Sequence, residues 1–377
     1  MHPGDGSDVS YDVHRLGRLR IGVSGSDAVL PYLRAELASL RADEGEPMLR
    51  FDFGAPFPVL DEAVVLSPLR IGRDAYVARH GGLEYHVSGV APRLHVRIRS
   101  LSRYGAERAA PAGLLRAGSR SHLLPSENTA KNFMYNVFDY LTQLSNLAVG
   151  QSYIHASSFE RDGRGVLLAA WGGVGKTTAM LKLVGEQGWR FLSDDLGLVD
   201  EDGTLWRTPK RLQVYAYNVE GQPQLYRTLM GRRSLMDRAS WHLRRATDGL
   251  QKVRRRVSAE DLFGAERVGT SARLTHVFAM ERADVPALML EPIDTREAVR
   301  RATSTVMREV QPMGDLISAM YSGSHHPVLP THEQFLRDTA ASLERAFGEL
   351  PVRLLRVPLR ASPDDLADFL VKTLNDA

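Results

Sequence analysis

The hydrophobic and polar positions of this 377-residue chain change their period near residue 125. Before that point, short segments alternate in polarity or are rich in β-branched residues, with glycine and proline between them, which is typical of strands. These segments are 18–23, 48–53, 62–66, 75–79, 83–88 and 94–99, and one helix is expected at 27–42. We therefore predict a small β-rich N-terminal domain over 1–125.

After residue 125, helical and strand patterns alternate, which indicates an α/β domain over 126–377. Hydrophobic residues recur at helical spacing from Phe133 to Ala148, and Asp294 and Glu297 form a capping box before another helix. Helices are also expected near 177–186, 331–347 and from 363 onward, and 223–265 is expected to be a basic helical insertion. Strands are expected at 153–156, 166–170, 189–193, 212–217 and 352–357, with a hairpin formed by 274–280 and 287–290.

Composition excludes several kinds of site. The chain has no cysteine, which excludes disulfides, thiolate zinc sites and a cysteine nucleophile. The N-terminal residues lack a basic segment followed by an apolar one, and no apolar stretch approaches the ~18 residues of a membrane span. We therefore expect no signal peptide, no membrane span and a cytoplasmic location.

Charge is nearly balanced overall, with 48 lysine and arginine residues against 45 acidic ones and a formal net charge of +3. Residues 227–256 depart from this balance, with ten basic side chains and two acidic ones, Asp237 and Asp248. Such a run is either a solvated helix face or a docking surface for an acidic partner. No helix-turn-helix, zinc-finger or RNA-binding signature accompanies it, so nucleic acid is not the expected partner.

The strongest chemical signal is a glycine-rich segment that follows the strand at 166–170. Residues 166–178 read VLLAAWGGVGKTT, which matches the phosphate-loop pattern except that Ala170 stands where the first glycine is usual. A strand enters this segment and a helix leaves it, as the pattern requires. An ordinary glycine-rich turn is therefore a poor alternative.

Each residue type in this segment suits a nucleotide phosphate. Glycines let successive N–H groups point into one cavity, and the helix beginning near Thr177 adds its positive N-terminal end. Lys176 places a point charge on the β- and γ-phosphates, and the Thr177 hydroxyl is the expected magnesium ligand. We therefore predict that ATP and Mg²⁺ bind at Gly172, Gly173, Val174, Gly175, Lys176, Thr177 and Thr178.

Two adjacent carboxylates, Asp194 and Asp195, follow the strand at 189–193. Asp194 comes 18 residues after Lys176, enough for one helix and a return strand, so the two strand ends are expected side by side. One carboxylate can then bind magnesium or orient a partner, while the other accepts a proton from an attacking hydroxyl. His155, near the end of the preceding strand, would approach both carboxylates if neighbouring strands end at one edge. Otherwise it is a core histidine.

Together these residues resemble the catalytic domain of HPr kinase/phosphorylase, and more closely the wider group of HPr-kinase-like proteins that includes the lasso-peptide kinases of biosynthetic gene clusters. The resemblance is carried by YIHASS, GRGVLLAAWGGVGKTTAMLKLV and GWRFLSDDLGLVDEDG. It implies a P-loop kinase domain of the HPr-kinase/PEP-carboxykinase-like type that uses ATP and Mg²⁺. It also implies Asp194 as the proton acceptor, with Asp195 paired to His155 at the magnesium site.

The chain departs from that family after the two carboxylates. A second family signature, which supplies a glutamate and an arginine, is missing, and RTPKRLQVYAYN stands at 207–218. Phosphorylase activity and HPr as a substrate are therefore not expected. Lys210 or Arg211 is the candidate replacement for the family's arginine near the γ-phosphate, unless both lie in a solvated loop.

These observations predict an ATP-dependent kinase that transfers the γ-phosphate to a hydroxyl, with Asp194 as general base and His155 and Lys176 in the catalytic site. The acceptor is a serine of a peptide or protein, or an alcohol of a small molecule. Its identity, the choice between ATP and GTP, and self-association into a homo-oligomer are left open. The alternative is a nucleotide-binding regulatory or scaffold protein without phosphate transfer, although such a switch needs no paired carboxylates.

Overall fold

The computed structural model describes residues 10–101, 107, 111–119, 122–323 and 328–375. The chain divides into two compact units. Unit 1 is Met1–Arg103, Thr129–Val149 and Pro312–His332, and unit 2 is Tyr104–Asn128, Gly150–Gln311 and Glu333–Ala377. This division differs from the boundary predicted at 125/126, because two later segments supply helices to the N-terminal sheet. Each unit is described by itself.

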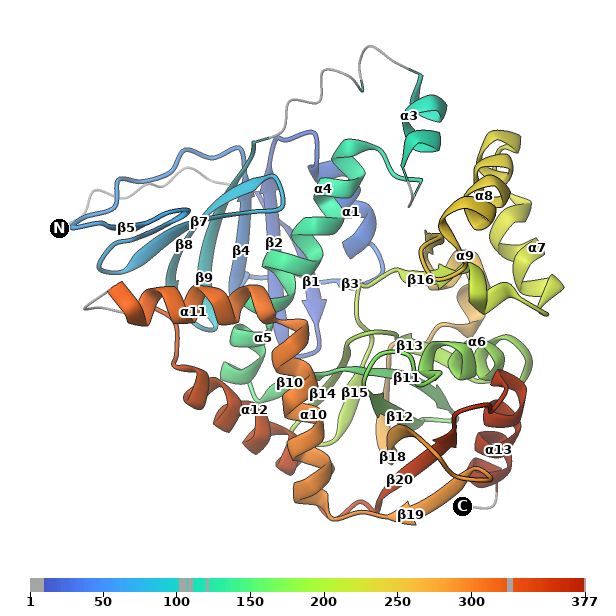
Figure 1. The fold of residues 1–377 in the computed structure, drawn as a ribbon. Helices are drawn as coiled ribbons and strands as arrows, with labels where there is room; N and C mark the ends of the chain where they lie inside the picture. The colour runs from blue at the N-terminus through green and yellow to red at the C-terminus, as the bar shows by residue number, and fades with distance from the viewer. Residues whose placement is uncertain (1–9, 102–106, 108–110, 120–121, 324–327, 376–377) are drawn as a thin grey trace. The chain divides into compact units, whose positions relative to one another are not determined.

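Unit 1 is built on a nine-stranded sheet (Figure 1). Across the sheet its strands are β3 (Arg41–Ala42), β1 (Asp12–Leu16), β2 (Leu19–Gly25), β4 (Leu49–Phe53), β9 (Arg93–Ser100), β8 (Leu83–Val90), β7 (Ala75–His80), β6 (Leu69–Ile71) and β5 (Val64–Leu66). The pairs β2–β4 and β4–β9 are parallel, and the others are antiparallel. The predicted β-rich region is therefore one continuous sheet.

Helices cover one face of this sheet. They are α1 (Leu30–Leu37), α4 (Pro125–Phe133), α5 (Asp139–Ala148) and α11 (Gln311–Gly323), with a π-helical turn at Met134–Phe138 inside the helix predicted around Phe133. The Phe51 ring of β4 packs 5.2 Å from the Phe133 ring, and the hydroxyls of Tyr76 and Tyr140 are 2.9 Å apart. Arg50 and Asp52 flank Phe51 in β4. Because strand side chains alternate, they lie on the opposite, polar face of the sheet.

Unit 2 contains a mixed sheet with a parallel centre. Across the sheet its strands are β10 (Gln151–Ile154), β14 (Gly197–Asp200), β15 (Thr204–Trp206), β18 (Ser271–Ala283), β12 (Arg164–Ala170), β11 (Ala156–Arg161) and β13 (Arg190–Ser193), and β20 (Val352–Pro358) also pairs with β18. The pairs β12–β18 and β18–β20 are parallel. Together with unit 1, this arrangement confirms a mixed α/β protein.

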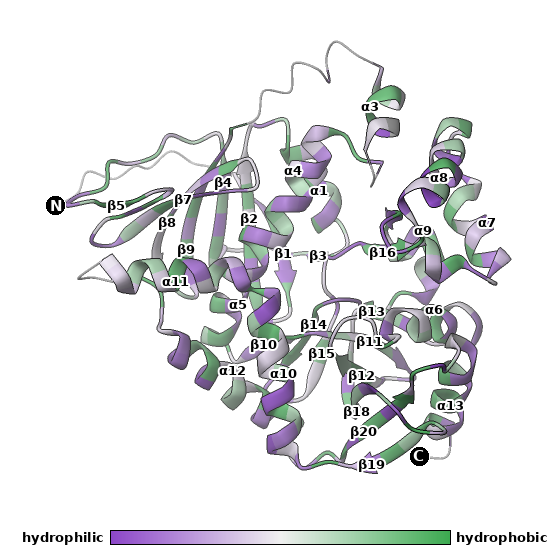
Figure 2. Ribbon diagram, viewed as in Figure 1, coloured by the Kyte–Doolittle hydropathy of each residue, from purple (hydrophilic) through white to green (hydrophobic). Residues whose placement is uncertain are grey.

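Two helix layers enclose this sheet. Val166 and Leu168 of β12 pack in a core with α6 (Lys176–Glu186) and α13 (Pro363–Asn375), whereas Leu167 packs with α10 (Thr295–Glu309) and α12 (His332–Phe347) on the other face. Both α10 and α12 are striped with hydrophilic and hydrophobic residues, as amphipathic covering helices require (Figure 2). The predicted cap of α10 is confirmed, because the Asp294 carboxylate accepts from the N–H groups of Arg296 and Glu297. Among the described helices, none has both the length and the apolar character needed to cross a bilayer.

Two local predictions for unit 2 are wrong. β18 and β19 (Met289–Pro292) do not form a hairpin, because β20 lies between them and pairs with both. The segment 223–265 is not wholly helical either. It contains α7 (Pro223–Gly231), α8 (Leu235–Asp248) and α9 (Ala259–Phe263), but Arg254–Val257 forms β17 against β16 (Leu212–Tyr215). A strand of sequence RRRV has no hydrophobic period that would identify it.

The remaining short elements of unit 2 are α3 (Ala112–Gly118) and two 3-10 turns at Ala216–Val219 and Ala265–Arg267. Trp241 of α8 is fully buried and belongs to the same core as α6 and β12. The small β16–β17 sheet and the helices around it therefore share one hydrophobic core with the face of the main sheet that α6 and α13 cover.

Candidate active site

The glycine-rich segment connects β12 to α6, as its pattern predicted. Gly173 and Gly175 have φ angles of +83° and +114°, a region that side chains rarely adopt. A Cβ at Gly172 or Gly173 would meet nothing within 4 Å, whereas one at Gly175 would lie 3.2 Å from Leu366. The first two glycines therefore face open space that a ligand can enter, and Gly175 permits the turn into α6.

Lys176 is buried at the start of α6. Its Nζ donates to the carbonyl oxygens of Ala170 at 2.7 Å and Trp171 at 3.2 Å. Burial lowers the pKa of Lys176 to about 8, although the carboxylates of Asp194 and Asp195 act in the opposite direction. A buried ammonium held only by carbonyl oxygens can exchange them for anionic phosphate oxygens, which are stronger partners.

Asp194 follows β13 and lies against the loop helix. One of its oxygens accepts from Ser157 Oγ at 2.5 Å, and Thr177 Oγ1 lies 3.1 and 3.0 Å from the two carboxylate oxygens. Burial raises the pKa of Asp194, opposed by the Ser157 hydrogen bond. The expectation that β12 and β13 lie side by side is wrong, because the antiparallel strand β11 separates them. The side chains nevertheless meet across β11, which supplies Ser157.

Asp195 occupies a different environment from Asp194. Lys210 Nζ lies 3.2 Å from one of its oxygens, and His155 Nδ1 lies 3.9 Å from the other. Burial would raise the pKa of Asp195, but the charges of Lys210 and His155 outweigh it and hold the pKa below its usual value. The backbone at Asp195 has φ of +75°, which turns the chain between the two carboxylates.

His155 lies between β10 and β11, at the point where the chain leaves one edge of the sheet for an interior position. Its Nδ1 is 3.2 Å from an oxygen of Glu309, the last residue of α10, yet this buried nitrogen makes no hydrogen bond. Burial and the charge of Lys176 lower the pKa of His155 to about 4. His155, Asp195 and Glu309 can each offer one ligand atom within 4.8 Å of the others, a group that could hold a metal ion.

Glu309 and Arg308 are site residues that the sequence did not reveal. The Arg308 guanidinium lies 4.0 Å from the ring centroid of Trp171, the exposed aromatic residue of the glycine-rich segment. Both residues end a helix that the sequence predicted correctly, but no local signal connects the end of α10 with a loop 137 residues earlier. Only the packing of α10 on the sheet brings them to His155 and Trp171.

A cavity of about 710 Å³ lies at the glycine-rich segment in unit 2. Tyr215 and Tyr217 line it as a stacked pair, with ring centroids 5.3 Å apart and an interplanar angle of 17°. Seven predicted nucleotide-binding residues line it as well: Gly172, Gly173, Val174, Gly175, Lys176, Thr177 and Thr178. Asp194, Asp195 and His155 complete one side, so the predicted site residues converge on one pocket.

The predicted substrate residues lie elsewhere. Lys210 is buried against Asp195, and neither Lys210 nor Arg211 is among the residues that line the cavity. Lys210 therefore lies where its charge neutralises Asp195. Arg308 packs against Trp171 of the glycine-rich segment, and Arg282 is among the residues that line the cavity.

The basic run 227–256 is largely occupied by internal contacts. Arg255 is fully buried and binds Asp237 at 2.7 Å. Local partners are also found for Arg233, Arg238, Arg244, Arg245 and Arg254. Arg227, Arg232 and Lys252 remain exposed. Three exposed cations are a weaker docking surface for an acidic partner than the ten that the sequence indicated.

Comparisons with known proteins identify no family. No family model matches the sequence, and no curated protein matches it. Among solved structures, the HPr(Ser) kinase/phosphatase from Coxiella burnetii aligns with 60% of this chain and 99% of its own, with a TM-score of 0.24 and 11% sequence identity. A likeness at this level does not say which reaction the chain performs.

Proposed function

We propose that this protein is an ATP-dependent kinase that transfers the γ-phosphate to a hydroxyl acceptor. The observation that carries the proposal is the contact between the Thr177 hydroxyl and the Asp194 carboxylate, at 3.0 and 3.1 Å. A hydroxyl at the start of the loop helix and a carboxylate at a strand end are the two parts that phosphate-loop enzymes bring together. A glycine-rich turn without function would not require them to meet in a pocket.

ATP phosphates are proposed to enter the open space above Gly172 and Gly173 and to accept hydrogen bonds from the loop N–H groups. Lys176 would exchange its carbonyl partners for phosphate oxygens. The N-terminus of α6 adds partial positive charge to the same position. These groups bind the triphosphate and stabilise negative charge as it develops.

Two positions fit a divalent cation. The Thr177 hydroxyl offers an oxygen donor, which suits Mg²⁺, and His155, Asp195 and Glu309 offer a mixed set, which suits Mn²⁺ as well. When bound, the cation would neutralise charge on the β- and γ-phosphates. The sequence assigned Thr177 and Asp195 to the metal, and the contacts described above add Glu309 beside His155.

Asp194 is the proposed proton acceptor. Lys210 engages Asp195, whereas Asp194 makes no ion pair with any residue of the described part of the chain and receives only hydroxyl hydrogen bonds. The acceptor oxygen forms a bond to the γ-phosphorus while the bond from that phosphorus to the bridging oxygen of ADP breaks. The hydroxyl proton passes to Asp194. Arg308, against the exposed ring of Trp171, is the residue proposed to stabilise charge on the transferred group.

The test is mass spectrometry of candidate acceptors incubated with the protein, ATP and Mg²⁺. Serine-containing peptides and small alcohols form the two arms, and a gain of one phosphoryl group with release of ADP is expected in one of them. Slow release of phosphate without any phosphorylated product, in both arms and in a cell extract, would support the regulatory or scaffold alternative.

The Asp194→Asn variant separates proton transfer from nucleotide binding. We expect it to bind ATP with Mg²⁺ but to lose about 10²–10⁴ in transfer rate. Asp195→Asn should instead raise the Mg²⁺ concentration needed for half-maximal ATP binding. Asp315→Asn, an exposed carboxylate of α11, is the matched control and should change neither quantity. If Asp195→Asn abolished transfer and Asp194→Asn changed only the Mg²⁺ requirement, the two roles would be exchanged.

A further inference from the structure

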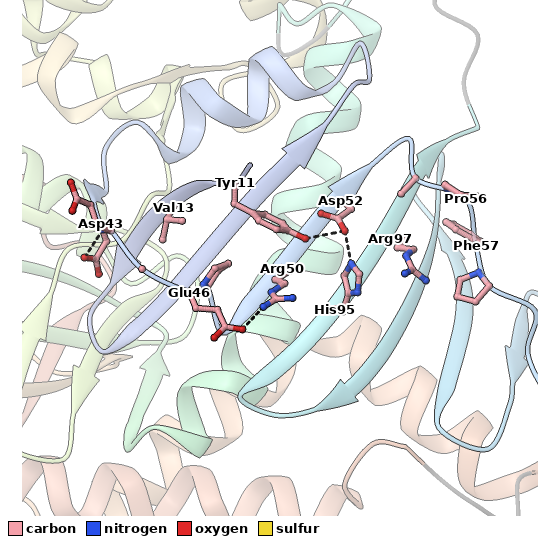
Figure 3. Close-up of a pocket in the computed structure, with 15 residues that line it drawn as sticks. Tyr11, Val13, Asp43, Glu46, Arg50, Asp52, Pro56, Phe57, His95 and Arg97 are labelled. Atoms are coloured by element: carbon pink, nitrogen blue, oxygen red, sulfur yellow. Dashed lines mark hydrogen bonds and ion pairs between the residues drawn. The ribbon is translucent and has the colours of Figure 1, made fainter. Parts of the chain in front are cut away.

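Unit 1 has a pocket of its own, on the polar face of its sheet. Its volume is about 1130 Å³, and its floor is formed by side chains of β4 and β9 together with Tyr11 and Val13 (Figure 3). The loops 43–47 and 55–58 form its sides. This volume exceeds what a single small anion fills and reaches the upper range of ligand pockets.

A buried carboxylate organises the floor of this pocket. Asp52 is 7% exposed, and one of its oxygens accepts from Ser24 Oγ at 2.5 Å. Its other oxygen accepts from Tyr11 OH at 3.2 Å and contacts His95 Nε2 (Figure 3). Burial would raise the pKa of Asp52, but the hydrogen bonds from His95 and Ser24 hold it below its usual value. The Asp52 carboxylate therefore has its hydrogen-bond partners within the pocket floor, and it fixes the ring of His95 at the base of the pocket.

Arg97 is left without a counter-ion by this arrangement. It lies directly opposite Asp52 in the register between β4 and β9, but Asp52 turns to His95 instead. Arg97 is half-buried, lines the pocket and makes no ion pair with any residue that the structure describes. Arg50, on the same floor, is already paired with Glu46 at 2.5 Å. A half-buried guanidinium that lines a pocket and has no carboxylate partner of its own is suited to bind an anionic ligand.

Arginine side chains continue beyond the pocket on the same face of the sheet. Glu84, fully buried on β8, is shared by Arg70, Arg79 and Arg99 on the same face. The Arg99 guanidinium also lies 4.8 Å from the ring centroid of Phe57, which lines the pocket. We call Arg70, Arg79, Arg97 and Arg99 the arginine track. Three of these cations share one buried carboxylate, Glu84, and the track lies on β9, β7 and β6 of a sheet whose neighbouring strands are about 5 Å apart.

We infer that this face of unit 1 binds an acidic polypeptide segment in an extended conformation. One carboxylate of the segment would pair with Arg97 beside His95, and others would follow the arginine track. Phe57 and the prolines beside it offer an apolar wall for intervening side chains. An extended chain presents alternate side chains about 7 Å apart, which is also the spacing of Arg97 and Arg99, two alternate residues of β9. This inference does not rest on the proposed kinase activity.

The acidic residues at one end of the pocket favour a peptide ligand over a nucleic acid. Asp43, Glu44 and Glu46 lie on the loop at one end of the pocket, and Arg97 and Phe57 lie at the other (Figure 3). A nucleic acid carries one negative charge at every residue and would meet this acidic rim. A peptide can place its carboxylates only where the arginines are and leave neutral or basic residues at the rim.

The experiment is fluorescence anisotropy with the full chain at low ionic strength, since screening acts over about 10 Å at 0.1 M salt. The probe is a labelled ten-residue peptide in which Glu alternates with Ser. Two further probes have the same length, one with Lys in place of Glu and one a single-stranded oligonucleotide. We expect the Glu peptide to bind most tightly and the Lys peptide to show no binding.

Arg97→Glu is expected to weaken binding of the Glu peptide by at least about tenfold, and Arg97→Gln by a smaller factor. Arg296→Glu is the matched control, because Arg296 is an exposed arginine of α10 in unit 2. It should leave peptide binding unchanged, and the unfolding midpoints of all three variants should equal that of the wild type. The inference would be overturned by wild-type peptide affinity in Arg97→Glu, by tighter binding of the oligonucleotide, or by an equal loss in Arg296→Glu.

Discussion

The pocket of unit 2 at the glycine-rich segment and the pocket of unit 1 around Asp52 hold buried carboxylates in opposite electrostatic settings. In unit 2, Asp194 makes no ion pair among the described residues, and burial raises its pKa. In unit 1, Asp52 is buried as well, yet hydrogen bonds from His95 and Ser24 lower its pKa. Glu84, in the same sheet, is also held below its usual pKa because Arg79 and Arg99 outweigh its burial.

The difference separates a carboxylate that does chemistry from one that positions its neighbours. A carboxylate without a strong partner is costly to bury, and it gains most from a proton or a cation that arrives with a ligand. A carboxylate with several donors has no capacity left for a ligand, but it fixes the side chains that it binds. We therefore expect changes in unit 2 to affect activity more than stability, and changes around Asp52 and Glu84 to do the reverse.

The largest expected effect is that of Lys176→Met in the phosphate loop. Phosphate transfer should fall by about 10²–10³, because the loop loses its only buried ammonium beside the phosphates. The unfolding midpoint should stay the same or rise, since a buried charge is replaced by an apolar side chain. Lys372→Met, on the exposed face of α13, is the control for both measurements. Transfer at the wild-type rate would contradict the assigned site.

Glu84→Gln tests the opposite half of the comparison. It leaves Arg70, Arg79 and Arg99 without the negative charge that they share. We expect a loss of about 2–4 kcal/mol in the free energy of unfolding, which is less than for a fully buried ion pair because the arginines are half exposed. Urea unfolding measures this loss, with exposed Glu44→Gln as the control. ATP affinity should be unchanged. A variant that lost ATP binding but kept its stability would break the distinction between the units.

Acid pH should sharpen the distinction between Asp52 and Asp194. The pKa of Asp52 is lowered in the folded state, so its stabilisation is complete above its unfolded pKa of about 4 and is lost as the pH falls through the folded pKa. Asp52→Asn should therefore lower the free energy of unfolding at pH 7 by about 1–3 kcal/mol and reduce its decline below pH 4.

Asp194→Asn should act with the opposite sign. Its raised pKa means that the charged form costs stability at neutral pH, and that this cost disappears as the pH falls through the raised value. The variant should be as stable as the wild type at pH 7, or more so. Urea titrations between pH 3 and pH 7 measure the free energy of unfolding of both variants. If stability depended on pH in the same way in both, the opposite pKa shifts of Asp52 and Asp194 would be refuted.

The smallest expected effect concerns Trp171 and Arg308. Trp171→Phe keeps an aromatic face under the guanidinium but a weaker one, so ATP affinity should change by about 0.5 kcal/mol or less. Arg308→Ala should lower the transfer rate by a larger factor while ATP affinity changes little. The fluorescence of Trp171, measured as the difference between wild type and Trp171→Phe, should also change when Arg308 is removed.

Local patterns predicted much of unit 2 because its site begins with a contiguous motif. The segment 166–178 contains the strand, loop and helix in one stretch, and the capping signal at Asp294 marked a helix start that the structure has. The same patterns failed where strands pair with distant segments. β20 enters between β18 and β19, and β11 between β12 and β13.

No motif marks the pocket of unit 1, since Ser24, Asp52, His95 and Arg97 come from three strands that are adjacent only in the sheet. Alternation within a strand does not say which charges on one face will meet. The division into two compact units departs from the boundary expected at residue 125 for a related reason. Helices α4, α5 and α11 come later in the chain than the sheet they cover, and their apolar faces do not say which sheet that is.

By itself, the sequence determined the chemistry available to this protein: a loop of glycines, one ammonium, one hydroxyl and two carboxylates in a spacing that allows them to meet. Only the tertiary structure decided which charged side chains lie beside each of these groups. Lys210 compensates Asp195 and leaves Asp194 unpaired, and α10 brings Glu309 and Arg308 to His155 and Trp171. The physical reason is that a charge acts over a few ångströms in space, whatever the separation of its partners along the chain.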